Sequence, residues 1–131
     1  MKRESVIEIL SNYFKENAIT YSVESAFLFG SYAKGFIKEE SDVDIAIVFS
    51  GSVDSDEKVF DIINKITIDI SSLINTEIDI LPIYRDFRKP MLYYNAIILG
   101  VPLYIKDKDQ YSQLFNEALF QMNDFELFCS S

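Results

Sequence analysis

Histidine is absent from this chain of 131 residues, and cysteine occurs only once, at Cys129. The absence of histidine excludes Ser-His-Asp and Cys-His catalytic sites, histidine-ligated zinc and acid–base catalysis by an imidazole. A single cysteine excludes an intramolecular disulfide and a zinc site built from cysteines. Catalysis by this chain would therefore depend on carboxylates, hydroxyls, amines, backbone groups and a hard metal ion.

Basic residues are also few, and long apolar runs are missing. The chain has 12 Lys and Arg against 21 Asp and Glu, a formal net charge of −9. Sequence-independent nucleic-acid binding depends on Lys and Arg contacts with phosphates, so we expect no direct nucleic-acid binding. No apolar run approaches the ~20 residues of a membrane span, and the charged start does not resemble a targeting signal. We therefore expect a cytoplasmic protein without membrane contact.

The chain does contain enough apolar sequence for one folded domain over residues 1–131. Hydrophobic residues make up 49% of it, which excludes a disordered protein. Helical spacing of apolar residues predicts helices at about 4–16, 55–75, 85–99 and 111–125. Short apolar, β-branched runs predict strands at 25–29, 43–49, 77–83 and 101–105. This alternation predicts an α/β (α+β) fold in which helices flank a small mixed β-sheet.

Several boundaries of these elements carry recognisable signals. Asp54 or Ser55 can cap the second helix, which we expect to end near Asn75. Pro82 is expected late in its strand or on a sheet edge, because proline cannot donate a ladder hydrogen bond. Pro90 is expected early in the third helix, with Gly100 as its C-cap.

The first segment with chemical potential is the end of the strand at 25–29, which runs into Gly30-Ser31. Glycine allows a sharp turn and close approach of a ligand to the backbone. Ser31 can cap a following short helix, whose free N–H groups would form an anion site. Lys34 would lie near the same site, and Gly35 would end the turn.

The second segment is Asp42-Val43-Asp44, which opens the strand at 43–49. Side chains two residues apart on a strand face the same side. Two carboxylates there repel each other unless one is protonated or a cation lies between them. Oxygen ligands without histidine or cysteine favour Mg²⁺ or Mn²⁺.

A third carboxylate is needed to complete such a metal site and to accept a proton. Asp79 lies mid-strand in Ile78-Asp79-Ile80, an unusual position for an acid that serves stability alone. It would be well placed if its strand lies beside the strand of Asp44. Asp69 offers a rival Ile-Asp-Ile, but it falls within a helical pattern and is expected to face solvent.

These motifs together carry a family resemblance. Gly30-Ser31-Tyr32-Ala33-Lys34-Gly35, followed by Ser41-Asp42-Val43-Asp44, resembles the signature of the DNA-polymerase-β-like nucleotidyltransferase superfamily. Within it, the chain is similar to the minimal nucleotidyltransferases, the MntA-type antitoxins that are paired with HEPN-domain toxins. The third strand with Asp79 and the later Gly100-Val101-Pro102 also fit. Lys34 stands where the family often has arginine.

The resemblance implies a nucleotidyltransferase fold and a mechanism. Asp42 and Asp44 would hold two divalent ions, Mg²⁺ or Mn²⁺, and Asp79 would ligate one of them. Gly30 and Ser31 would bind the phosphates of ATP, with Lys34 and Ser41 nearby. The implied reaction transfers AMP to a tyrosine hydroxyl of a partner HEPN toxin, and Asp79 is the candidate general base.

Two other functions remain open on the sequence alone. The chain could modify a small molecule, as aminoglycoside nucleotidyltransferases do, although it lacks their added helical domain. It could also be a non-catalytic antitoxin that acts by binding.

Three further features have simpler interpretations. Gly51 to Asp56 also pairs Gly-Ser with Asp-x-Asp, but at a spacing that suits a loop and a helix cap. Arg85, Arg88 and Lys89 fit a solvated helix start. Phe120 and Phe128 fall off the apolar stripe of the last helix and would mark a partner surface.

Overall fold

A mixed β-sheet forms the centre of the computed structural model, which describes residues 3–30 and 42–130, with side chains as far as residue 123. Within the described ranges its strands are β1 (Val23–Phe29), β2 (Val43–Phe49), β3 (Ile78–Ile83) and β4 (Val101–Ile105). Their order across the sheet is β3-β2-β1-β4. β1 is antiparallel to β2 and β4, and β2 is parallel to β3. The predicted small mixed sheet is confirmed.

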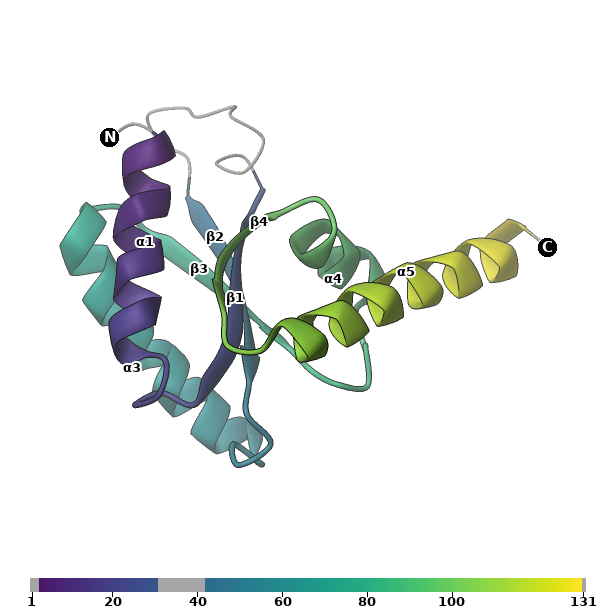
Figure 1. The fold of residues 1–131 in the computed structure, drawn as a ribbon, viewed down its shortest axis with the longest axis horizontal. Coiled ribbons are helices and arrows are strands. Elements are labelled where there is room, and N and C mark those ends of the chain that lie inside the picture. The colour runs from purple at the N-terminus through teal and green to yellow at the C-terminus, as the bar shows by residue number, and fades with distance from the viewer. Residues whose placement is uncertain (1–2, 31–41, 131) are drawn as a thin grey trace.

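Helices cover both faces of the sheet (Figure 1). α1 (Arg3–Asn17) and α3 (Asp56–Ile74) cover one face, and α4 (Pro90–Ile97) and α5 (Lys108–Ser130) cover the other. The far end of α5 projects beyond the sheet in Figure 1. No helix in the described part of the chain is both long enough and apolar enough to span a membrane.

Alternation along β2 divides the core into two layers. Val43, Ile45 and Ile47 are fully buried against α1 and α3. Ala46 and Val48 point the other way and pack with buried side chains of α4, such as Tyr93. Because residues two apart share a face, Asp44 lies on the α4 side of the sheet, near the start of β2.

The boundary signals of α3 and β3 are confirmed. The Ser55 hydroxyl oxygen accepts a hydrogen bond from the Lys58 N–H at 3.2 Å, as an N-cap does. The helix ends at Asn75, which has a left-handed backbone with φ of 52°. The Gly51 segment is therefore a turn that leads into a helix cap. Pro82 is the fifth residue of β3, and β3 is an edge strand.

The expected helix at 85–99 is shorter in the structure. α4 begins only at Pro90, and the preceding segment contains a turn in which the Phe87 N–H bonds to the Tyr84 carbonyl at 3.1 Å. Phe87 has φ of 48°, which a right-handed helix excludes, and a residue before proline disfavours helical backbone. The basic cluster, Arg85, Arg88 and Lys89, thus precedes α4 and does not form its first turn.

Gly100 was expected to cap α4, but the C-cap is Ile98. Gly100 is instead a point of close backbone approach. A Cβ atom there would collide with the Ala96 carbonyl oxygen and would lie 2.8 Å from that of Leu28. The glycine therefore allows the chain to pass from α4 into β4 beside β1.

Candidate active site

Three acidic residues from the predicted site lie at one end of the sheet, where β2 and β3 begin. Asp44 is aligned with Asp79 in the parallel pairing of these strands. Asp42 lies two residues before Asp44, just ahead of β2. Aligned residues on neighbouring strands are about 5 Å apart, and all three residues occupy positions on the α4 side of the sheet. The predicted adjacency of the strands of Asp44 and Asp79 is confirmed.

The ionised carboxylate of Asp44 is disfavoured in this arrangement. Burial raises the pKa of its carboxyl, and the negative charges of Asp79 and then Asp42 raise it further. Asp44 is half-buried, whereas Asp42 and Asp79 are exposed. A cation bound among these groups would relieve both their repulsion and the desolvation of the Asp44 carboxylate.

Gly30 completes the described part of the site. It follows β1 directly and has φ of 74°, a left-handed conformation that side chains other than glycine rarely adopt. A Cβ atom at this position would collide with the Oδ2 atom of Asp44. The glycine thus provides the predicted turn and also the space that the Asp44 carboxylate occupies. The predicted approach of a ligand to its backbone stays a prediction.

The donor set fits a hard divalent cation in its chemistry, because all three side chains offer carboxylate oxygens. Among the described residues, no three acidic side chains already form a complete metal-binding group. The backbone register brings the residues to neighbouring positions, and the exposed side chains of Asp42 and Asp79 are free to turn toward a cation. The strand register therefore places the three carboxylates near one another, although their side chains do not yet converge on one point.

Other predicted site residues lie outside the described part of the chain. These are Ser31, Lys34 and Ser41, together with Gly35. Their proposed contacts with phosphate therefore remain predictions from the motif.

Asp69, the rival of Asp79, is not part of this site. Its Oδ2 atom accepts hydrogen bonds from the hydroxyls of Tyr13 at 2.7 Å and Tyr21 at 3.0 Å. The expectation that Asp69 simply faces solvent was wrong, because it is half-buried between α1 and α3. The periodicity did assign it correctly to a helix.

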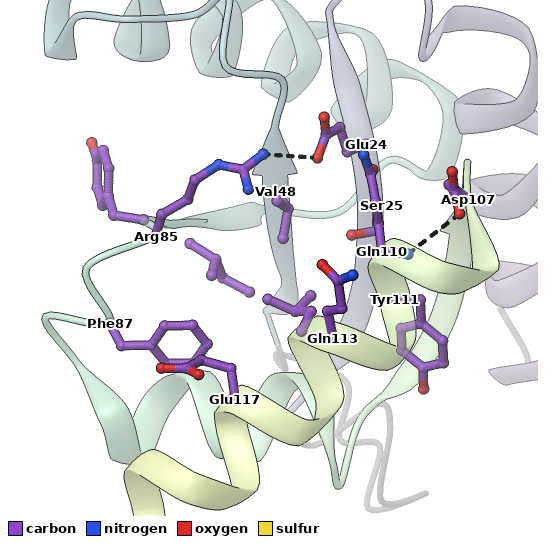
Figure 2. A pocket seen from close by; sticks show the side chains of 13 residues that line it. Glu24, Ser25, Val48, Arg85, Phe87, Asp107, Gln110, Tyr111, Gln113 and Glu117 are labelled. Atoms are coloured by element: carbon purple, nitrogen blue, oxygen red, sulfur yellow. Dashed lines mark hydrogen bonds and ion pairs between the residues drawn. The ribbon is translucent and has the colours of Figure 1, made fainter.

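A cavity of about 300 Å³ lies at the opposite end of the same face, between α5 and the segment after β3 (Figure 2). Sequence reasoning missed it. Its lining residues come from segments far apart in the chain, so no local pattern marks them. Arg85 of the basic cluster lies at this cavity, paired with Glu24 at 3.2 Å.

Comparisons with known proteins agree with this geometry. The chain matches the family described as Polymerase beta, Nucleotidyltransferase over residues 4–109. A curated relative from Methanocaldococcus jannaschii, whose name contains the words protein adenylyltransferase, is 50% identical over 42 residues. That match covers 32% of this chain and 49% of the relative, so the chain matches about half the length of this curated protein.

Solved structures share the fold at low sequence identity. A toxin–antitoxin structure with AMP-PNP superposes with a TM-score of 0.69 and 15% identity, covering 89% of this chain and 90% of that one. A complex of the tri-AMPylated Shewanella oneidensis HEPN toxin with MNT antitoxin gives a TM-score of 0.65 at 12% identity, covering 92% and 90%. The family match spans most of the chain and includes Gly30, Asp42, Asp44 and Asp79. The chain therefore belongs to the polymerase beta nucleotidyltransferase family of enzymes.

Proposed function

We propose that this chain is a metal-dependent nucleotidyltransferase that transfers AMP from ATP to a tyrosine hydroxyl of a HEPN-domain toxin, and so acts as the antitoxin. The observation that carries the proposal is the alignment of Asp44 with Asp79, next to the glycine turn at Gly30. The names of the structural neighbours, which include AMP-PNP and an AMPylated HEPN toxin, support the choice of nucleotide and partner.

Asp42 and Asp44 would hold two Mg²⁺ ions, or Mn²⁺ in their place, and Asp79 would ligate one of them. The raised pKa of Asp44 supports this assignment, because its carboxylate lacks a compensating positive charge in the described structure. Bound ions would supply charge stabilisation to the attacking and leaving oxygens of the transferred nucleotidyl group.

The chain's own residues would position the substrates. Gly30 lets the backbone approach the β- and γ-phosphates of ATP without a side chain between them. Ser31, Lys34 and Ser41 would add a hydroxyl, an ammonium and a second hydroxyl to this phosphate site. Asp42, Asp44 and Asp79, with their bound ions, would then lie beside the triphosphate from which pyrophosphate leaves.

Proton transfer would involve Asp79. Its exposed carboxylate can accept the proton of the acceptor hydroxyl as the hydroxyl oxygen bonds to the α-phosphorus. The bond from the α-phosphorus to the bridging oxygen breaks, and pyrophosphate leaves. The product is AMP joined to the tyrosine oxygen by a phosphodiester bond.

The test is AMP transfer to a co-purified HEPN toxin with ATP and Mg²⁺, followed by mass spectrometry of the toxin's tyrosine peptides. Asp44→Asn should reduce AMP transfer at least about 100-fold, because metal ligands contribute more than the residues that orient them. Asp61→Asn is the matched control, since Asp61 lies on the exposed side of α3 and its one ion pair among the described residues is with Lys65. Equal transfer by the wild type and Asp44→Asn would contradict the proposal.

The two other functions give distinct outcomes in the same experiment. A non-catalytic antitoxin would neutralise the toxin without modifying it, and Asp44→Asn would neutralise as well as the wild type. A small-molecule enzyme would leave the toxin unmodified but would transfer AMP to an aminoglycoside when a panel of these compounds replaces it. Either result would overturn the proposed acceptor.

A further inference from the structure

The cavity beside α5 is separate from the candidate active site. Val48 of β2 and Ile83 of β3 line it, each four residues beyond Asp44 and Asp79 respectively. Four residues of strand span about 13 Å, and buried side chains of α4 pack on the sheet between the two sites. A ligand in this cavity would therefore not occupy the position proposed for the triphosphate.

Its floor contains a polar group, the hydroxyl of Ser25. Ser25 is only 6% exposed, and it is the one polar residue among the described residues that is classed as buried. Its hydroxyl makes no hydrogen bond among the described residues, and its oxygen is not enclosed by protein atoms but open to the cavity. Figure 2 shows the side chain at the cavity with Gln110 and Gln113 across from it. A ligand in the cavity can therefore donate a hydrogen bond to this hydroxyl oxygen.

The charged residues around the cavity indicate the sign of the charge that a ligand would carry. Three carboxylates line it, from Glu24, Asp107 and Glu117, against the single guanidinium of Arg85. Arg85 is already paired with Glu24. The N-terminus of α5 offers no anion site either, because the Asp107 carboxylate accepts the N–H groups of Asp109 at 2.8 Å and Gln110 at 3.3 Å. The cavity therefore favours a cation.

The walls and surroundings of the cavity suit a protein side chain better than an isolated small ion. Phe87 and Leu114 give it apolar walls that can hold an aliphatic stem. The side of α5 that borders the cavity continues past Glu117 to Phe120, which is 64% exposed. Residues three apart on a helix are neighbours, so an apolar contact lies next to the polar cavity.

We propose that this cavity binds an arginine side chain presented by a protein partner. The guanidinium has five N–H donors, enough to bond to the Glu117 carboxylate, the Ser25 hydroxyl oxygen and the Gln113 side-chain carbonyl together. Its stem would lie on Phe87 and Leu114, and an apolar neighbour of the arginine would cover Phe120. This surface is independent of the transfer reaction, so it holds whichever acceptor the active site uses.

The first test is a titration of the full chain, labelled with ¹⁵N, with N-acetyl-arginine amide. We expect saturable shifts of the side-chain amides of Gln110 and Gln113 at millimolar concentration, while ATP with Mg²⁺ should leave them in place. N-acetyl-citrulline amide has nearly the same shape without the charge and should bind at least about fivefold more weakly. Equal shifts with both compounds, or none with arginine, would overturn the proposal.

Matched variants locate the binding site. Glu117→Gln removes one exposed carboxylate at the cavity and should weaken arginine binding about fivefold. Glu8→Gln makes the same change on the exposed surface of α1, on the other face of the sheet, and should leave binding unchanged. Equal weakening by both variants would show attraction to the net charge of −9 alone and would contradict a specific site.

A peptide tests the commitment to a protein partner. A short acetylated peptide with leucine three residues before its arginine should bind more tightly than N-acetyl-arginine amide. Phe120→Ala should remove that gain but leave binding of N-acetyl-arginine amide unchanged. If the peptide binds no better than the single residue, the cavity is a site for a small cation and the proposed partner is wrong.

Discussion

At the scale of single residues, Asp44 carries an energetic cost at the position proposed for metal binding. Burial and two neighbouring carboxylates raise its pKa, so its ionised form destabilises the folded chain at neutral pH. That cost is present above the raised pKa and disappears as the pH falls and the group becomes protonated. A group of like charges that lowers the stability of the folded chain is typical of a functional site.

Removing the charge should therefore stabilise the metal-free protein. We expect Asp44→Asn to raise the Tm in EDTA at pH 7.5 by up to about 3 °C, since the carboxyl is half-exposed and solvent screens part of its repulsion. Added Mg²⁺ should raise the Tm of the wild type and leave that of the variant almost unchanged. A lower Tm for Asp44→Asn in EDTA, or equal stabilisation of both proteins by Mg²⁺, would contradict this account; Asp61→Asn serves as the control.

Gly30 gives a second prediction at this scale. Gly30→Ala should lower the free energy of unfolding by about 1–2 kcal/mol, because alanine resists a left-handed backbone. Its Cβ would also displace the Asp44 carboxylate, so Mg²⁺-dependent stabilisation should decrease. Gly51→Ala is the control, since a Cβ at Gly51 meets nothing within 4 Å. Urea unfolding of both variants measures the difference, and equal effects would argue against strain at Gly30.

The role or environment of a single residue could be predicted only where the neighbouring sequence determines it. Strand periodicity puts the side chains of Asp42 and Asp44 on one face, and Asp79 is favoured because the rival Asp69 falls within a helical pattern. The environment of Asp69 could not be predicted, because its partners Tyr13 and Tyr21 lie 56 and 48 residues away in the chain. Ser25 was likewise hidden, since a serine in a strand gives no sign of the cavity beside it.

At the scale of elements, the strands were the most predictable parts. β2 and β4 have the predicted bounds, because each is a short apolar run between polar or glycine residues. The start of α4 was not predictable from apolar spacing. That spacing continues back through Tyr84 and Phe87, but the left-handed backbone of Phe87 and the proline at Pro90 delay the helix.

The contact of α1 with α3 includes a hydrogen bond from Tyr13 to Asp69 beside their shared apolar core, and this bond gives a prediction for the pair. Burial, and then the hydrogen bond to Asp69, raise the pKa of Tyr13 far above its usual value. Tyr13→Phe should lower the free energy of unfolding at pH 8 by about 1.5–3 kcal/mol, the usual contribution of a hydrogen bond to a charged group.

The pH dependence of this effect has a definite sign. The Tyr13 hydroxyl stays neutral in the folded chain but ionises near pH ~10 in the unfolded chain, so its stabilising contribution falls as the pH rises above that value. The stability difference between wild type and Tyr13→Phe should therefore shrink between pH 8 and pH 11. Tyr104→Phe is the control, because the Tyr104 hydroxyl has no hydrogen bond among the described residues. A difference that stays constant or grows would refute the assignment.

At the scale of the whole molecule, the two candidate sites lie at opposite ends of the sheet on one face. The three aspartates lie where β2 and β3 begin, and the cavity of about 300 Å³ lies where these strands end. The order of strands that creates this arrangement could be predicted only as a mixed sheet, because pairing depends on contacts between distant segments. The family resemblance supplied what the local patterns did not, namely that Asp44 and Asp79 would meet.

The net charge of −9 also has a clearer meaning at this scale. Part of it gathers at Asp42, Asp44 and Asp79, where a divalent cation would neutralise it, and part lines the cavity beside α5. The lack of histidine is consistent with both sites, since carboxylates and hydroxyls supply the groups that each requires.

The most direct test of the central claim is the fate of each phosphate of ATP. The chain, the HEPN toxin and Mg²⁺ are incubated in parallel with ATP labelled at the α-phosphorus or at the γ-phosphorus. Nucleotidyl transfer predicts that the toxin acquires the α-label alone, that the γ-label appears in pyrophosphate, and that Asp79→Asn abolishes both results. Transfer of the γ-label to the toxin, or transfer that is unchanged in Asp79→Asn, would contradict the account.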